Sequence, residues 1–155
     1  MAADPPDRMR TLFERTEVGD SFETAGRTVT EADVVNFAGV SGDFNHHHVD
    51  ADRMADTDYG GRIAHGAFVF AAATGLLWQS RSPADREDVV AFYGVDDLRF
   101  PAPTRIGDTI SAVFEVIKKD PRETPDASGV ISYDVTGRRS DGTTVLSCEL
   151  LTLVR

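Results

Sequence analysis

The segment over residues 63–80 constrains the fold most, because apolar side chains cover nearly every side of it at helical spacing. A helix that is apolar all round is buried within a core. The longest apolar run, residues 67–78, has about a dozen positions, whereas a membrane span needs roughly 20. We therefore expect one central buried helix in a soluble, cytoplasmic protein without a membrane segment.

After Pro83 the sequence changes to the alternation of apolar and polar residues that is typical of β-strands. Four strands are expected, over residues 89–95, 109–118, 130–138 and 144–154. An irregular stretch at residues 98–103 contains two prolines, and Asp141-Gly142 is a hairpin turn signal. This order predicts an α+β domain in which an antiparallel sheet wraps around the central buried helix.

The chain before the helix divides into a leader and the start of the domain. Prolines near the N-terminus disfavour a regular element there, so we expect a mobile leader over residues 1–15. The remaining residues, 16–155, have the size of one domain. A short strand is expected around residues 22–29.

A helix and a long polar excursion come next. Thr30 and Asp33 have the spacing of a capping box, which predicts that a helix starts there. Gly39 and Gly42 are expected to end it. Residues 41–61 are then polar and rich in turn formers, and a long excursion of this kind in a compact domain is often functional.

The charge and the cysteine content exclude several classes of function. The net charge is −10 with a pI near 4.7, and such a surface repels nucleic acids and anionic membranes. Our hypothesis for this charge is a cytosol of very high salt, where screening makes it tolerable. The single cysteine, Cys148, excludes an intrachain disulfide and an all-cysteine metal site, and its apolar neighbours indicate a buried strand position.

The polar excursion contains the residue types that acid–base chemistry requires. Asp43 and His48 can both reach one water molecule if the loop between them folds back, and well-placed groups of this kind contribute about 10²–10⁴-fold each. Gly66 lies near the start of the buried helix, where unpaired amides can stabilise a developing oxyanion. Glycine also permits close approach of a ligand to the backbone.

These motifs resemble the signature of the MaoC-like dehydratases, which include the (R)-specific enoyl-CoA hydratases. The first part of the match consists of Ser41, Gly42, Asp43, Asn45, His48 and Asp50, and the second of Ile63, His65 and Gly66. Further similarity lies in Leu98-Arg99-Phe100-Pro101-Ala102-Pro103 and Gly107-Asp108-Thr109-Ile110. The resemblance covers roughly residues 20–155. One departure is His46, which stands where the family has a loop-stiffening proline.

The resemblance implies a hot-dog fold that pairs into homodimers, with acyl-CoA lying between the protomers. It assigns the catalytic pair to Asp43 and His48 and the oxyanion donor to Gly66. By this resemblance, Asn45 matches a residue that shapes the catalytic loop. We also expect substrate-binding positions at Ser41, Asn45, His65 and Phe68. The implied reaction is reversible hydration of trans-2-enoyl-CoA to (R)-3-hydroxyacyl-CoA, with no metal and no cofactor beyond the CoA thioester.

Several alternatives remain open on the sequence. A related enzyme could act on a branched or carboxylated acyl-CoA, or a hot-dog thioesterase could release free CoA. A non-catalytic subunit that binds acyl groups is a third possibility. His65 could be a structural residue at the helix start, Arg62 could meet a CoA phosphate or form a surface ion pair, and Phe68 could belong to the core. The three consecutive histidines raise a metal hypothesis, which no ligand-spacing motif supports.

Overall fold

The computed structural model describes residues 10–155, with Glu123 described by its backbone alone. The helices are α1 (Leu12–Arg15), α2 (Glu31–Ser41), α3 (His46–Val49), α4 (Ala51–Ala55), α5 (Gly66–Ser80) and α6 (Pro83–Asp88). The strands are β1 (Ser21–Glu23), β2 (Arg27–Thr28), β3 (Val89–Arg99), β4 (Thr109–Thr124), β5 (Ala127–Arg139) and β6 (Thr144–Val154).

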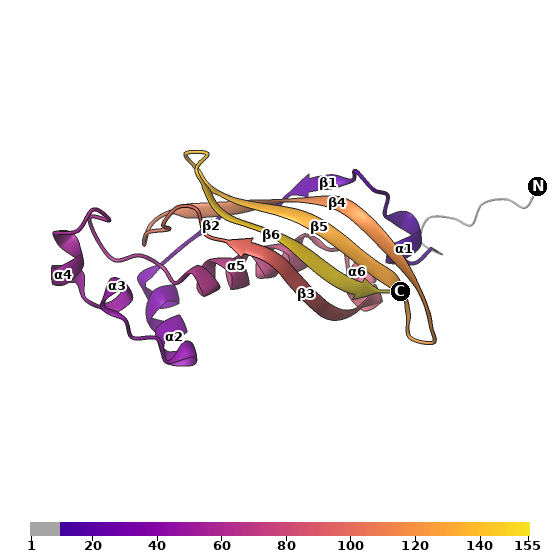
Figure 1. The fold of residues 1–155 in the computed structure, drawn as a ribbon, viewed down its shortest axis with the longest axis horizontal. Helices are drawn as coiled ribbons and strands as arrows, with labels where there is room; N and C mark the ends of the chain where they lie inside the picture. The colour runs from indigo at the N-terminus through magenta and orange to yellow at the C-terminus, as the bar shows by residue number, and fades with distance from the viewer. Residues whose placement is uncertain (1–9) are drawn as a thin grey trace, which may run out of the picture.

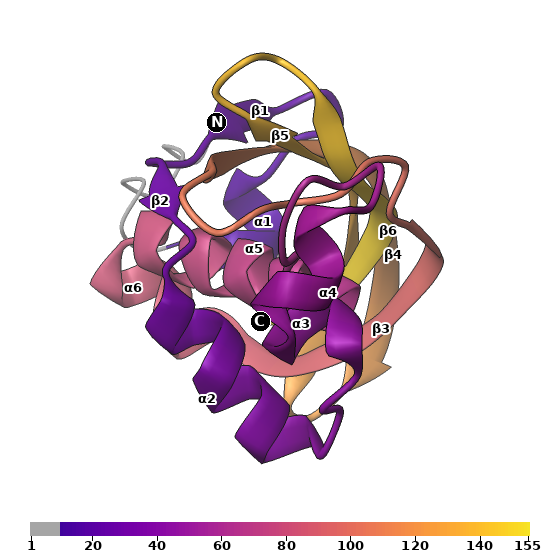
Figure 2. The same ribbon diagram turned by 90° about the vertical axis from the view of Figure 1, so that its left-hand side faces the viewer.

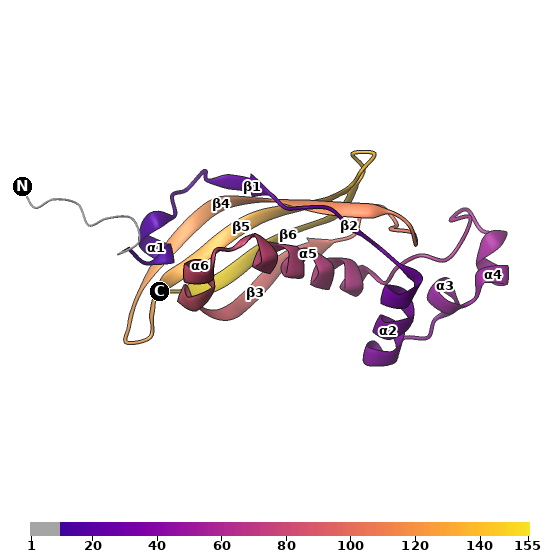
Figure 3. The same ribbon diagram turned by 180° about the vertical axis from the view of Figure 1, so that it is seen from behind.

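The strands form one antiparallel sheet in the order β1-β4-β5-β6-β3, and β2 also pairs with β4. The sheet curves over α5, which runs along its concave side (Figures 1 and 3). Helices α2, α3 and α4 project beyond one end of the sheet, at the N-terminal end of α5, as the end-on view shows (Figure 2). The predicted sheet wrapped around a central helix is therefore confirmed.

The core lies between the concave face of the sheet and α5. The alternation predicted for β4 is confirmed, because Ile110, Ala112, Phe114 and Val116 are each at most 3% exposed. Burial of α5 is one-sided. Its sheet-facing residues are buried, whereas Trp78 on the other side is 45% exposed. A helix that is apolar all round thus leaves an apolar face uncovered here.

Cys148 has the structural position that its neighbours indicated. It lies in β6 and is 4% exposed, within the main hydrophobic cluster. Burial raises the pKa of its thiol to about 11, and Asp134 adds to this increase. The side chain therefore behaves as a small apolar core residue rather than a nucleophile.

The segment before α5 follows the predictions with two differences. Instead of one strand over residues 22–29, the chain forms the two short strands β1 and β2. The capping box is present, since Thr30 Oγ1 accepts from the Asp33 amide and Asp33 accepts from the Thr30 amide. Gly42, with a φ of 76°, ends α2, while Gly39 lies inside the helix.

The expected leader ends earlier than residue 16. Residues 1–9 lie outside the described part of the chain, but α1 is packed against the domain. Leu12 is 8% exposed, the amide of Phe13 donates to the carbonyl of Arg155 at 2.9 Å, and Arg15 pairs with Asp85 at 2.8 Å. These contacts tie α1 to the residue that follows β6 and to α6, so the packed domain already includes this helix.

The close contact between α1 and β5 makes Gly129 sensitive to any added side chain. A Cβ there would lie 2.6 Å from the carbonyl oxygen of Asp120 and would overlap the ring of Phe13. We expect Gly129→Ala to lower the free energy of unfolding by about 1–3 kcal/mol, the usual cost of overpacking. Urea unfolding measures this, with Gly39→Ala in α2 as the control. Nothing lies within 4 Å of a Cβ at Gly39, so that change should not destabilise the protein.

Within residues 10–155, no helix combines the length and apolar character that crossing a bilayer requires. The cytoplasmic location stays a prediction.

Candidate active site

The loop that carries the predicted catalytic pair starts where α2 ends. Gly42 adopts the left-handed conformation that reverses the chain after the helix. The hydroxyl of Ser41 donates to the carbonyl of Phe37 at 2.7 Å and accepts from the amide of Asp43 at 3.2 Å. Ser41 was expected to bind substrate. In the structure its hydroxyl fixes the backbone that carries Asp43.

Asn45 continues this local network. The carboxylate of Asp43 accepts from the amide of Asn45 at 3.1 Å, and the side-chain oxygen of Asn45 accepts from the amide of His47 at 3.1 Å. The second bond caps α3, the short helix that carries His48. Asn45 thus shapes the loop, as the family resemblance implied, and its contact with substrate stays a prediction.

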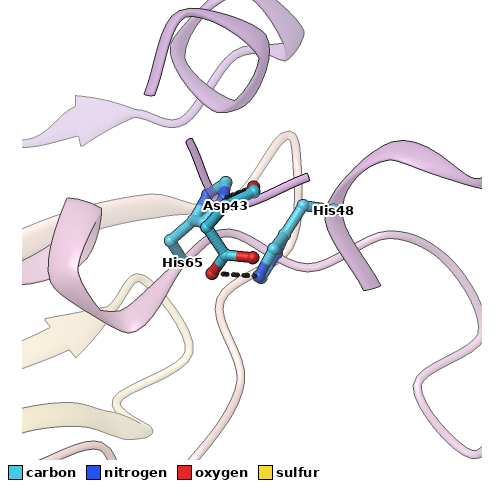
Figure 4. A group of neighbouring side chains, drawn as sticks. All are labelled: Asp43, His48 and His65. Atoms are coloured by element: carbon cyan, nitrogen blue, oxygen red, sulfur yellow. Dashed lines mark hydrogen bonds and ion pairs between the residues drawn. The ribbon is translucent and has the colours of Figure 1, made fainter. Parts of the chain in front are cut away.

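The predicted pair comes together beside the start of α5 (Figure 4). The Oδ2 atom of Asp43 lies 3.8 Å from Nε2 of His48, so one water molecule can contact both atoms. Nδ1 of His48 lies 2.7 Å from the carbonyl oxygen of Ile63. Because a carbonyl only accepts, Nδ1 carries the hydrogen and the lone pair of Nε2 faces Asp43.

The surroundings of His48 favour its neutral form. Burial lowers the pKa of His48 below its ordinary value, and His65 lowers it further. The hydrogen bond to Ile63 and the carboxylate of Asp43 oppose this decrease without cancelling it. The imidazole is 12% exposed, while the Asp43 side chain is 53% exposed. The site therefore offers a neutral imidazole base next to an open carboxylate.

The start of α5 lies next to this pair, because His65, the residue before the helix, neighbours Asp43 and His48. The first amides of a helix have no partner within the helix, and His65, the residue before α5, makes no capping bond to them through its side chain. Gly66 is the first residue of α5, and a Cβ there would lie 2.7 Å from Cδ2 of Phe100. Close approach of the Phe100 ring therefore requires glycine at this position.

The remaining predicted residues separate into different roles. Phe68 is 7% exposed and packs edge-on against Phe37, so it is a core residue. Arg62 pairs with Glu31 at 2.8 Å, which is the surface ion pair left open by the sequence. Two residues that shape the candidate site had no individual signal in the sequence that would have identified them. Ile63 acts through its main-chain carbonyl, and Phe100 was noted only as part of a family motif.

The three consecutive histidines do not converge on one point. The rings of His46 and His47 stack at 4.2 Å, and His47 turns its edge towards Tyr59. Asp43, His48 and His65 do offer ligand atoms within 4.8 Å of one another. However, the rings of His48 and His65 are stacked at 3.5 Å, with 23° between their planes. Imidazoles bind metal along lone pairs in the ring plane, so this arrangement fits chelation poorly.

Two hollows lie along α5. One, of about 430 Å³, lies between α5 and β3 and is lined by apolar residues that include Phe70, Leu77 and Phe92. The other, of about 310 Å³, lies beside Gly66 and is lined by Phe100 and the loop that follows it. The first hollow begins at Phe70, one turn after Gly66, and follows the uncovered face of α5. Its walls are apolar, as the binding site of an acyl chain must be.

Known proteins are similar to this chain both in sequence and in fold. The MaoC like domain matches residues 13–137. The chain is 45% identical over 101 residues to Protein MaoC of Klebsiella aerogenes, a match that covers 65% of this chain and 29% of that protein. It is 37% identical over 116 residues to the (R)-specific enoyl-CoA hydratase of Rhodospirillum rubrum, covering 75% of each.

Solved structures of other proteins have a similar fold. A monoamine oxidase regulatory protein from Archaeoglobus superimposes with a TM-score of 0.84 at 37% identity, over 92% of this chain and 93% of that one. A Mycobacterium tuberculosis protein with a double hot-dog fold gives a TM-score of 0.77 at 22% identity, over 92% of this chain and 43% of that one. Fold and site together therefore define a hot-dog-fold hydro-lyase. The chain belongs to the MaoC-like dehydratase family.

Proposed function

We propose that this protein is an (R)-specific enoyl-CoA hydratase, which adds water reversibly to trans-2-enoyl-CoA. The observation that carries the proposal is the 3.8 Å approach of the Asp43 carboxylate to the lone pair of His48 Nε2, beside the uncapped start of α5. The relative from Rhodospirillum rubrum, which is named for this reaction, supports the choice of substrate and the (R) configuration.

The chemistry follows from these positions. A water molecule held by Asp43 and His48 loses a proton to the pair while its oxygen bonds to C3 of the substrate. The electrons of the double bond move towards C1, and the thioester carbonyl becomes an enolate that accepts from the Gly66 amide. The carbonyl then re-forms as C2 takes a proton from the pair. The pair regains its initial protonation, so the sum is one water added across the double bond.

The acyl chain and the assembly belong to the same proposal. The hollow of about 430 Å³ between α5 and β3 receives the acyl chain, and the reaction needs no cofactor beyond the CoA thioester. β3 is an edge strand, with Phe92 55% and Tyr93 54% exposed. Such an edge is available for pairing with another strand. A second copy of the chain would cover both the edge and the hollow, which makes the proposed assembly a homodimer.

The direct test uses crotonyl-CoA and follows the absorbance of the enoyl thioester, at low and at molar KCl. Loss of this absorbance, with (R)-3-hydroxybutyryl-CoA as the product on a chiral column, supports the proposal. Release of free thiol without loss of the double bond identifies a thioesterase instead. A panel of longer, branched and carboxylated enoyl-CoA substrates then separates the related dehydratases. If none of these substrates is turned over, the remaining hypothesis is a non-catalytic subunit that binds acyl groups.

The pH dependence of the reaction should report the protonation of His48. We expect kcat/KM to fall on the acid side with a midpoint below about 6.5, the ordinary pKa of histidine. The reason is that burial lowers the pKa of His48, and protonation removes the lone pair that takes the proton of water. Activity is therefore complete above this midpoint and lost as the pH decreases through it. Initial rates at low crotonyl-CoA concentration measure the profile, and an acid midpoint above 6.5 contradicts the assignment.

A further inference from the structure

The active site is assembled from two chain segments that are separate in sequence. The loop over residues 43–48 supplies the carboxylate and the imidazole, whereas residues 63–66 supply the carbonyl that orients His48 and the amide at the start of α5. Both segments must act on one substrate molecule. Their relative position therefore determines whether the pair and the oxyanion donor can work on the same thioester.

Each segment contributes one imidazole that reaches a main-chain carbonyl of the other segment. Nδ1 of His48 lies 2.7 Å from the carbonyl oxygen of Ile63, and Nε2 of His65 lies 2.9 Å from the carbonyl oxygen of Asp43. The two rings stack at 3.5 Å. Figure 4 shows the bond from His65 to Asp43. The bond from His65 ends on the residue that carries the catalytic carboxylate, and His65 directly precedes Gly66.

We propose that His65 is a positioning residue, which holds Asp43 in register with the amide of Gly66 through its bond to the Asp43 carbonyl. This inference rests on the proposed function and assigns His65 a role without substrate contact, in place of the substrate-binding role that was expected from the sequence. Because the Asp43 carbonyl only accepts, His65 is neutral with its hydrogen on Nε2, or else protonated on both nitrogens.

The burial of His65 shows that packing alone does not account for it. The residue is 4% exposed and its ring also contacts Phe37. Its Nδ1 has no hydrogen-bond partner among the described residues. A buried polar atom without a partner costs free energy, and an apolar side chain would fill the same space without that cost. The bond to Asp43 is therefore the contact for which the imidazole is needed.

Two polar substitutions separate the bond from the packing. A glutamine can place its amide nitrogen near the position of Nε2 and so can still donate to Asp43, whereas the shorter asparagine reaches only as far as Nδ1. We expect His65→Asn to lower kcat for crotonyl-CoA about 10²-fold, the effect of a displacement of about 1 Å at the reacting groups. We expect KM to change less than kcat, because the displaced groups act in the transition state. His65→Gln should recover most of the lost kcat.

A second measurement follows the loop directly. Hydrogen exchange of the amides over residues 43–49 should accelerate in His65→Asn and remain near the wild-type rate in His65→Gln. Cys148→Ala is the matched control, because it removes a buried side chain from β6 outside this site. That variant is expected to be less stable while its kcat and its loop exchange stay unchanged, which separates general destabilisation from loss of position.

The outcomes distinguish this inference from the proposed function. If the wild-type protein hydrates crotonyl-CoA and the two His65 variants have equal kcat values, the positioning role is wrong and the proposed function stands. Equal rates of hydrogen exchange over residues 43–49 in both variants would also show that the positioning role is wrong. If the wild-type protein hydrates no enoyl-CoA, the proposed function fails, and the exchange measurement still tests whether His65 holds the loop.

Discussion

Asp43→Asn and His48→Gln are each expected to lower kcat for crotonyl-CoA hydration by about 10²–10⁴-fold, because each removes one group of the acid–base pair. Asparagine keeps the size of Asp43 but cannot take a proton, and glutamine at position 48 supplies no basic nitrogen. KM should change little, since neither side chain is needed to hold the acyl chain or CoA. Steady-state kinetics on folded, purified variants measures both constants.

The double variant provides the sharper test of this pair. Two groups that act on the same water should not have additive effects, so the double variant is expected to be about as slow as the slower single variant. His46→Gln is the matched control, because His46 lies on the same short helix but stacks on His47. A His48→Gln variant as active as His46→Gln would refute the catalytic assignment.

Gly66→Ala is also expected to have a large effect, a decrease in kcat of about 10²-fold. The added methyl group would lie 2.7 Å from the Phe100 ring, so either the ring or the start of α5 must move. A displacement of about 1 Å at the oxyanion donor is enough to cause a loss of that size. Alanine favours helices more than glycine does, so unfolding measurements should show that this loss is not due to a weaker helix.

A compensating change identifies the cause. In a Phe100→Ala background the methyl group has room, and Gly66→Ala should then lower kcat much less than it does with Phe100 present. The same loss in both backgrounds would show that contact with Phe100 is not responsible. Full activity of Gly66→Ala alone would mean that the first residue of α5 can shift without any effect on the reaction.

Local features of the chain were predictable because each depends on neighbours in sequence. The capping box of Thr30 and Asp33, the turn at Gly42 and the alternating face of β4 all have the structure that was expected. The local backbone also explains why the family can have proline at the position of His46. His46 is the first residue of α3, where the amide has no helical partner, and Asn45 has the extended ψ of 142° that precedes proline readily.

By itself the sequence determined the fold class and the positions of most elements, and it predicted a site at Asp43, His48 and Gly66. Only the tertiary structure decided how these groups are held. The bonds from His48 to Ile63 and from His65 to Asp43 join residues 15 and 22 positions apart, and Phe100 reaches Gly66 from beyond α5. Periodicity and capping describe contacts within about one turn of chain, whereas these contacts depend on the path that brings distant segments together.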